Sequence, residues 1–213
     1  MSSRFYARCT HGFLYDYKRL ARLVTITGGA GADVLIGGDG ADTFILANVA
    51  NVKATADNIL DFTTSDNIAI QAFGEFSLHQ ANGDAFFGTF AGVVSTVNIA
   101  DGAANLATKN ANVIAIHANT ADLAVGYENI GALQTAVDGA AITEIDGGSF
   151  ADGDELLIVW FNTTDNAYEL GIITVEGGNG FDGADETYEK LLEVDVVGTL
   201  TLAEVAASID FIS

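Results

Sequence analysis

Hydrophobic and polar positions follow a nine-residue rhythm between residues 28 and 45. Two consecutive phrases, GGAGADVLI and GGDGADTFI, place glycines at positions one, two and four and an aspartate at position six, followed by a short, largely apolar tail. Only the middle side chain of each tail, Leu35 or Phe44, is expected to point inward. A glycine turn with a three-residue strand is half of one coil. Two phrases therefore predict one 18-residue coil of a parallel β-roll.

A second, degenerate coil is predicted downstream. Residues 57–60 (DNIL) and 66–69 (DNIA) repeat the aspartate and apolar half of the phrase at the same spacing of nine. The longer interval from Asp42 to Asp57 places a bulge at residues 47–55. Upstream, residues 19–27 have Ile26 at an inward position but lack the glycines and the aspartate.

The nine-residue rhythm stops after residue 70, and other β-rich runs take over. The predicted elements are a buried strand at 112–118, a short helix at 128–137 ended by Gly139, a β-hairpin of 155–161 and 167–175, a strand at 191–197, and a last helical turn opened by a capping box at Thr201 and Glu204.

These elements predict a mainly β protein, with a short parallel β-roll stacked on a β-rich C-terminal domain with minor helix. The expected parts are a basic N-terminal cap or remnant at residues 1–24, a calcium-binding β-roll at 25–70, and a β-rich capping and secretion-signal domain at 71–213. The head has an apolar stripe at helical spacing. It is interpreted as a helix or extended segment that covers the open start of the roll, with a membrane-surface helix as the alternative.

Composition adds a strong acidic balance. The 213 residues include 29 Asp and Glu against 8 Lys and Arg, a net charge of −21, which disfavours nucleic acid and anionic membranes as partners. Cations are the natural counterpart. Cys9 is the only cysteine, so the sequence allows no internal disulfide.

The repeated phrase also has the chemistry of a calcium loop. Its glycines let carbonyl oxygens converge, its aspartates supply charge, and Ca²⁺ takes six to eight oxygen ligands. This nonapeptide resembles the known Ca²⁺-binding repeat of parallel β-helices. Because each ion sits between loops of neighbouring coils, we expect Asp33 to face Asp57 on one edge and Asp42 to face Asp66 on the other, giving about two sites. The candidate ligands are Gly28, Ala30, Asp33, Gly37, Asp39, Asp42, Asp57, Asp61 and Asp66.

The repeats and the NILDFTTSDNI segment at 58–68 resemble the end of the repeat block in RTX (haemolysin-type calcium-binding) proteins. The tail, at residues 151–160, 191–193 and 210–213, is similar to C-terminal regions of bacterial RTX proteins exported by type I secretion, including surface-layer-like ones. The resemblance implies an uncleaved C-terminal export signal, the type I secretion apparatus as a partner, and a secreted, extracellular or cell-surface location.

No enzyme is predicted. The three histidines are not spaced as a zinc set, and no Gly-x-Ser-x-Gly nucleophile motif is present. The leading hypothesis is a secreted calcium-binding module that folds outside the cell. The alternatives are a surface-layer or adhesin-type protein with homotypic or cell-surface assembly, and the non-catalytic end of an extracellular hydrolase. A glycine-rich loop at 177–182 is interpreted as a third calcium loop or a plain connection.

Overall fold

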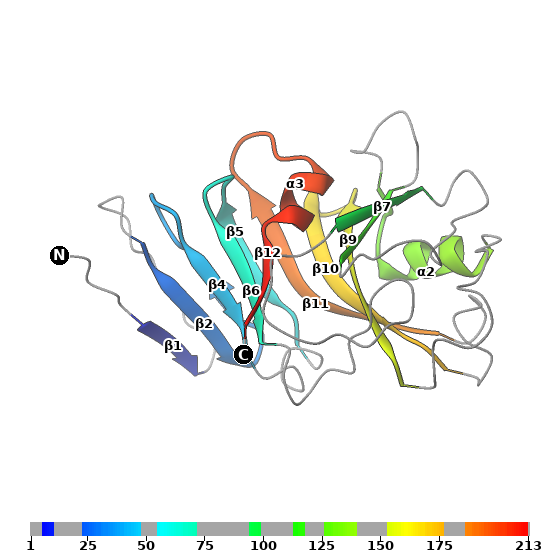
Figure 1. The fold of residues 1–213 in the computed structure, drawn as a ribbon, viewed down its shortest axis with the longest axis horizontal. Helices are drawn as coiled ribbons and strands as arrows, with labels where there is room; N and C mark the ends of the chain where they lie inside the picture. The colour runs from blue at the N-terminus through cyan, green and yellow to red at the C-terminus, as the bar shows by residue number, and fades with distance from the viewer. Residues whose placement is uncertain are drawn as a thin grey trace.

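The computed structural model describes residues 6–10, 23–47, 55–71, 94–98, 113–117, 126–139, 153–176 and 186–212. These residues form a mainly β fold of two sheets, shown in Figure 1. Sheet A has the strand order β1-β2-β4-β6-β12, and sheet B has the order β3-β5-β11-β10-β9-β8-β7. The predicted fold class is confirmed.

The nine-residue phrases wind between the two sheets. The strands involved are β2 (Thr25–Ala30), β3 (Val34–Leu35), β4 (Thr43–Leu46), β5 (Asp57–Phe62) and β6 (Asn67–Gln71). Successive strands alternate between sheet A and sheet B, and every pairing within a sheet among them is parallel. This alternation is the predicted parallel β-roll, because a glycine turn redirects the chain after each short strand.

The C-terminal strands continue both sheets of the roll. β11 (Thr187–Val196) pairs in parallel with β5, and β12 (Ile209–Ile212) pairs in parallel with β6, so these two strands form a third coil. Figure 1 shows the red β12 beside the cyan β6. Strand pairing therefore runs across residue 70, and the roll and the C-terminal part share two continuous sheets.

The remaining strands extend the sheets on either side. β9 (Glu155–Asn162) and β10 (Ala167–Thr174) form the predicted hairpin, and β10 pairs antiparallel with β11. β8 (Val113–His117) and β7 (Val94–Asn98) follow β9 in parallel. At the other end, β1 (Tyr6–Thr10) pairs in parallel with β2, so part of the N-terminal head is extended chain beside the start of the roll.

One hydrophobic core fills the space between the sheets. On sheet A, the inward ladder begins with Ile26, Phe44 and Ile68, which pair across neighbouring strands and are at most 1% exposed. On sheet B, Leu35 pairs with Ile59 and Ile59 with Val194. The inward positions that the phrase predicts are thus buried, and their row continues into β11.

Two helices lie in the described part of the chain. α2 (Ile130–Gly139) matches the predicted short helix, and α3 (Leu202–Ala207) begins at the predicted capping box. α3 packs against β7, β8 and β9, which places it over the inner face of sheet B. Neither of these helices is long and apolar enough to cross a membrane.

Thr201→Ala is expected to destabilise the protein by about 1 kcal/mol, because it removes the N-cap of α3. The Thr201 hydroxyl accepts the backbone N–H of Glu204 at 3.3 Å, and Glu204 Oε2 accepts the backbone N–H of Thr201 at 2.8 Å. Thr201→Ser keeps the hydroxyl and is the matched control. Urea unfolding checks the difference; equal midpoints for the two variants would contradict this role for the cap.

Three sequence predictions lie outside the described residues: most of the bulge at 47–55, the glycine-rich loop at 177–182, and the apolar stripe of the head up to residue 22.

Candidate metal centre

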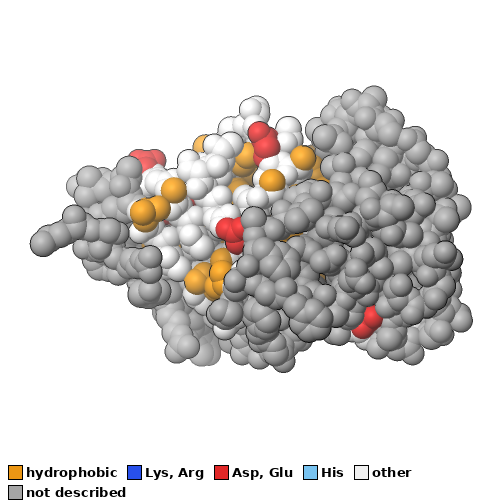
Figure 2. All heavy atoms as spheres, viewed as in Figure 1, with side chains coloured by type: hydrophobic (Ala, Val, Ile, Leu, Met, Phe, Trp, Pro, Cys, Tyr) orange, Lys and Arg blue, Asp and Glu red, His pale blue; other side chains and the backbone are white. Residues whose placement is uncertain are grey.

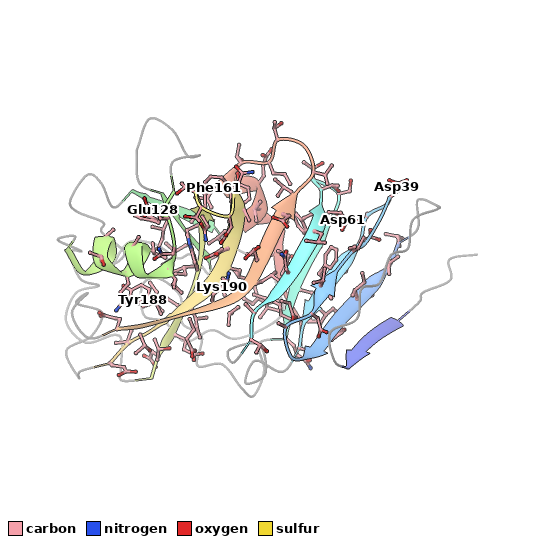
Figure 3. All side chains as sticks on the ribbon, turned by 180° about the vertical axis from the view of Figure 1, so that it is seen from behind. Asp39, Asp61, Glu128, Phe161, Tyr188 and Lys190 are labelled. Atoms are coloured by element: carbon pink, nitrogen blue, oxygen red, sulfur yellow. The ribbon has the colours of Figure 1, made fainter. Side chains whose placement is uncertain are left out.

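The coils turn from one sheet to the other at two edges. The first edge holds the turn between β2 and β3 with Asp33, and the residue Asp57 that begins β5. The second edge holds the turn between β3 and β4 with Asp39 and Asp42, and the turn between β5 and β6 that leads to Asp66. In Figure 3, Asp39 and Asp61 lie at the same end of the strands, at this second edge.

At the first edge, the structure brings Asp33 and Asp57 together. Asp57 Oδ1 accepts the backbone N–H of Asp33 at 2.9 Å, and the two residues are 1% and 2% exposed. A Cβ placed on Gly28 would lie 2.5 Å from Asp57 Oδ2 and 3.3 Å from Asp33 Oδ2. The second oxygens of both carboxylates therefore face a stretch of backbone that only glycine leaves open.

At the second edge, Asp42 repeats this arrangement one half-coil later. Its Oδ1 accepts the backbone N–H of Val24 at 2.9 Å, while a Cβ on Gly37 would lie 2.5 Å from its Oδ2. Asp42 is 1% exposed, and within the described part of the chain its Oδ2 has no hydrogen-bond partner. Asp66 Oδ1 accepts the backbone N–H of Asp42 at 2.8 Å, so the aspartates are linked from coil to coil.

Asp61 and Asp66 also tie their own edge together. Asp61 accepts the backbone N–H groups of Gly37 at 2.9 Å and Gly38 at 2.7 Å with its two oxygens. Asp66 Oδ2 accepts both the backbone N–H and the hydroxyl of Thr63. These two carboxylates hold the loops of neighbouring coils in place. Asp39 is exposed at the tip of its turn.

Ala30 is the last residue of β2 and pairs with Thr10 of β1. It lies in the same turn region as Gly28, so its backbone belongs to the first edge. The structure thus places all nine predicted ligands at the two edges, with Asp33 beside Asp57 and Asp42 beside Asp66.

At both edges, burial and neighbouring charges disfavour the ionised form of the aspartates when no cation is bound. Burial raises the pKa of Asp57 to about 6, and the charge of Asp33 adds to the rise, although the hydrogen bond from the Asp33 backbone opposes it. Burial also raises the pKa of Asp42, opposed by the hydrogen bond from Val24 and assisted by the charges of Asp66 and Asp61. Desolvated like charges at short range favour either protonation or a bound cation.

The coils contain almost no positive charge to offset these carboxylates. Between residues 25 and 71 the sequence has a single basic residue, Lys53, which lies outside the described residues. On the face seen in Figure 2, the coloured side chains of the described residues are hydrophobic or acidic, and none is basic.

A hard divalent cation fits these edges. Each edge offers buried carboxylate oxygens that face a glycine backbone, and oxygen is the ligand atom that Ca²⁺ takes in proteins. The partnerless Oδ2 of Asp42 is the clearest sign, because a buried charged oxygen without a donor is costly unless a cation approaches it. At Gly28 and Gly37 the missing side chain lets the carboxylates of Asp57 and Asp42 lie directly against the loop backbone.

Sequence reasoning missed two features. One is the use of Oδ1 of Asp57, Asp42 and Asp66 as acceptors for backbone N–H groups of the preceding coil, which needs the three-dimensional register. The other is a polar cluster on the outer face of sheet B that contains Lys190. Its signal in the sequence is the alternation of acidic and apolar residues at 192–195 (LEVD), which predicts carboxylates on the outward face.

Coils whose strands pair in parallel within two facing sheets, with glycine and aspartate at the turns, define an RTX-type β-roll. Residues 14–140 match the family model described as Peptidase M10 serralysin C terminal. The match covers more than half of the chain, and the chain belongs to this family. The searches of curated proteins and of solved structures gave no match.

Membership of this family bears on where the protein is found and on which metal it binds. Serralysin C-terminal domains occur in RTX-type secreted proteins, bind calcium, and are non-catalytic regions. The family therefore supports a secreted, extracellular protein with a link to type I export.

Proposed function

We propose that the coils bind about two calcium ions, one at each edge, and that this chain is a secreted module whose coils fold outside the cell when calcium is bound. At the first edge the ligands are the carboxylates of Asp33 and Asp57 with backbone oxygens around Gly28 and Ala30. At the second edge they come from Asp42 and the Gly37–Asp39 turn, with Asp61 and Asp66 holding the loops.

The observation that carries this proposal is that the two oxygens of each carboxylate, in Asp42 and in Asp57, have different surroundings. One oxygen of each carboxylate accepts a backbone N–H of the neighbouring coil, and the other faces a glycine that leaves room beside it. Because these glycines have no side chain, the second oxygen lies directly against the backbone of a loop, where a cation can take both the carboxylate and the loop carbonyl oxygens as ligands.

Calcium binding at these edges is expected to couple to folding. Without a cation, each edge buries carboxylates against one another, and bringing the coils together costs free energy. At the first edge the ligands come from two coils, and at the second edge Asp61 and Asp66 of the next coil hold the ligand loop in place. Both sites therefore exist only in the folded roll, and binding stabilises that state. Extracellular calcium modules typically have affinities of about 10⁻⁴ to 10⁻³ M, so folding would follow export.

Circular dichroism and thermal unfolding of the full chain test the proposal. In calcium-stripped buffer the β signal and the melting temperature are expected to be lower than in a few millimolar Ca²⁺, roughly ten times the typical dissociation constant. Mg²⁺ at the same concentration is the control, because its smaller octahedral shell fits such loops poorly. Identical spectra and melting in all three buffers would overturn the proposal.

Gly37→Ala is expected to weaken calcium binding at the second edge at least tenfold, because its Cβ would crowd Asp42 Oδ2 at 2.5 Å. Gly31→Ala is the matched control. Gly31 has φ of 107°, so alanine strains the backbone there, yet a Cβ would have no neighbour within 4 Å. Calcium titration by calorimetry distinguishes the two variants. An affinity loss in Gly31→Ala as large as that in Gly37→Ala would contradict the role of crowding at Asp42, because Gly37 is not in the positive-φ region and Gly31 is.

A second candidate function is that this chain forms the non-catalytic end of an extracellular protease. The family description, which names a peptidase C terminus, favours it. A longer reading frame upstream of Met1 that encodes a zinc protease motif would support this candidate, and its absence in the genomic sequence would remove it. Neither the comparisons nor the described residues support homotypic or surface-layer assembly.

A further inference from the structure

A polar network lies on the outer face of sheet B, apart from the two edges of the coils. Asp165, Glu169 and Glu193 each place a carboxylate oxygen within 4.8 Å of the others. Glu169 is 2% exposed, so its charge is buried. Burial and the charge of Glu193 also raise the pKa of Asp195, although a hydrogen bond from Asn58 opposes the rise.

Lys190 supplies the positive charge of this network. Its Nζ donates to Glu169 Oε1 and Glu193 Oε2, both at 3.0 Å. Although desolvation alone would lower the pKa of Lys190, the hydrogen bonds and charges of Glu193 and Glu169 raise it. Lys190 is also the only basic residue between positions 153 and 212. The ammonium group is therefore held charged between two carboxylates.

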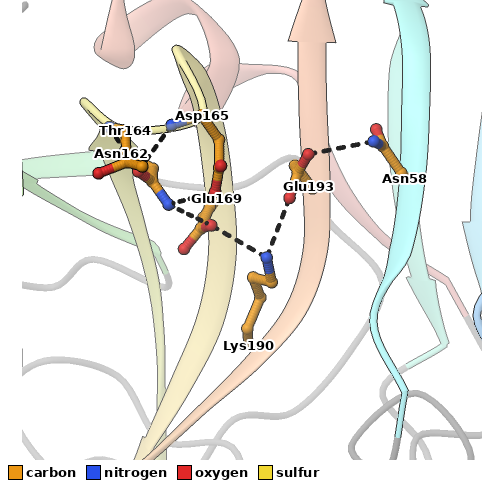
Figure 4. A network of polar contacts seen from close by, with 7 residues as sticks. All are labelled: Asn58, Asn162, Thr164, Asp165, Glu169, Lys190 and Glu193. Atoms are coloured by element: carbon orange, nitrogen blue, oxygen red, sulfur yellow. Dashed lines mark hydrogen bonds and ion pairs between the residues drawn. The ribbon is translucent and has the colours of Figure 1, made fainter. Parts of the chain in front are cut away.

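The network joins the C-terminal sheet to the calcium coils, as Figure 4 shows. Glu193 Oε1 accepts Asn58 Nδ2 at 3.1 Å, and Asn58 is the neighbour of Asp57 on β5. On the other side, Asn162 Nδ2 donates to Glu169 Oε1 and Asp165 Oδ2, each at 2.8 Å. Polar contacts thus run without a break over four adjacent strands, from β5 through β11 and β10 to β9.

The row of edge aspartates ends where this network begins. β11 pairs with β5 so that Leu192 stands opposite Asp57, and the third coil has an apolar residue at the position of the aspartate. Leu192 is fully buried. Lys190 lies two residues before Leu192 on the same strand. Among the described residues, the first two coils have several edge carboxylates and no basic side chain, whereas the third coil has this lysine.

We infer that Lys190 is a positioning residue for the calcium site at the first edge, acting as a fixed cation at the junction between the coils and the C-terminal sheet. With its ammonium in place, β9, β10 and β11 pair without a divalent ion. The free edge of β11 can then pair with β5 when calcium binds, and this pairing brings Asp57 into position. This inference rests on the proposed calcium binding by the coils.

Hydrogen exchange of the full chain, measured by mass spectrometry with and without calcium, tests the inference. In calcium-stripped buffer, amides of β9, β10 and β11 are expected to keep their protection within about threefold of the calcium value, whereas amides of β3 to β6 lose at least about 100-fold. Lys190→Met is expected to lower protection of β9 to β11 at least tenfold without calcium, because Glu169 stays buried without its cation.

Lys190→Met is also expected to weaken calcium binding at the first edge in calorimetry, because Glu193 loses the lysine that holds it against Asn58, the neighbour of Asp57. Lys190→Arg keeps a cation and is the matched control; it should behave as wild type. If Lys190→Met fails to fold in both buffers, Lys190→Met/Glu169→Gln decides, because Glu169 is the buried carboxylate that loses its cation. This double variant removes one uncompensated charge, and recovered protection supports the inference, while no recovery overturns it.

Two other results would overturn the inference. In the first, the amides of β9 to β11 in the wild-type protein lose as much protection without calcium as those of β3 to β6. In the second, Lys190→Met shows the same hydrogen exchange as the wild-type protein in both buffers. These outcomes leave the proposed calcium binding standing, because β3 to β6 still respond. A chain in which no segment responds to calcium would overturn the proposed function and the inference together.

Discussion

Asp57→Asn is expected to abolish calcium binding at the first edge while stabilising the calcium-free protein. The asparagine carbonyl can still accept the backbone N–H of Asp33, which Asp57 Oδ1 does at 2.9 Å. The variant loses the buried charge whose pKa stands at about 6. At pH 7 without calcium, we expect a gain of up to about 3 kcal/mol in the free energy of unfolding. In calcium, affinity at this edge should fall at least about 100-fold, because a carboxylate ligand becomes an amide.

Asp57→Ala separates the two roles of the side chain. It removes the ligand as well as the acceptor, and the buried N–H of Asp33 is left without this partner. We therefore expect Asp57→Ala to be about 1–3 kcal/mol less stable than Asp57→Asn in calcium-stripped buffer. Urea unfolding gives the stabilities, and calorimetry should show the number of bound ions falling from about two to one in both variants. Wild-type calcium binding by Asp57→Asn would contradict the assignment of Asp57.

The pH dependence of stability is expected to change sign with calcium. Burial raises the pKa of Asp57 from 3.8 to about 6 in the folded chain. Between these values the folded state holds more protons than the unfolded state, so raising the pH removes stability. The contribution of Asp57 is about 3 kcal/mol, lost as the pH rises from about 4 to 6. The raised pKa of Asp42 acts in the same direction.

With calcium in excess the same window should show the opposite slope, because binding requires deprotonated carboxylates and so strengthens as the pH rises. Urea midpoints at pH 4, 5, 6 and 7, in calcium-stripped buffer and in calcium, measure both slopes. Asp57→Asn isolates the contribution of this residue, since it has no proton to lose. A wild-type slope that equals the Asp57→Asn slope without calcium would show that Asp57 titrates as an ordinary aspartate.

The repeat predicted the roll because its rule is local. Glycines at fixed offsets make the turns, and one apolar residue per short strand, such as Leu35 or Phe44, must point inward. The nine-residue spacing also predicted which aspartates would meet, because coils stack in register. The capping box at Thr201 and the hairpin at residues 155–175 are local signals of the same kind.

The third coil could not be predicted from that rule. β11 and β12 join the roll through parallel pairing with β5 and β6, over sequence separations of more than 100 residues, and neither strand carries the glycine and aspartate phrase. What they share with the coils is only an apolar inward row that continues Ile59 with Val194 and Ile68 with Ile209. The link from Lys190 to Asn58 depends on this pairing. The alternation at 192–195 indicates that Glu193 faces outward, but it does not indicate which strand lies beside it.

Diffraction from crystals grown in millimolar calcium tests the central claim most directly, with anomalous scattering used to locate the ions. The predicted result is one peak at each edge, at about 2.3–2.6 Å from Asp57 Oδ2 at the first and from Asp42 Oδ2 at the second. Well-ordered coils with no peak beside either aspartate would contradict the account.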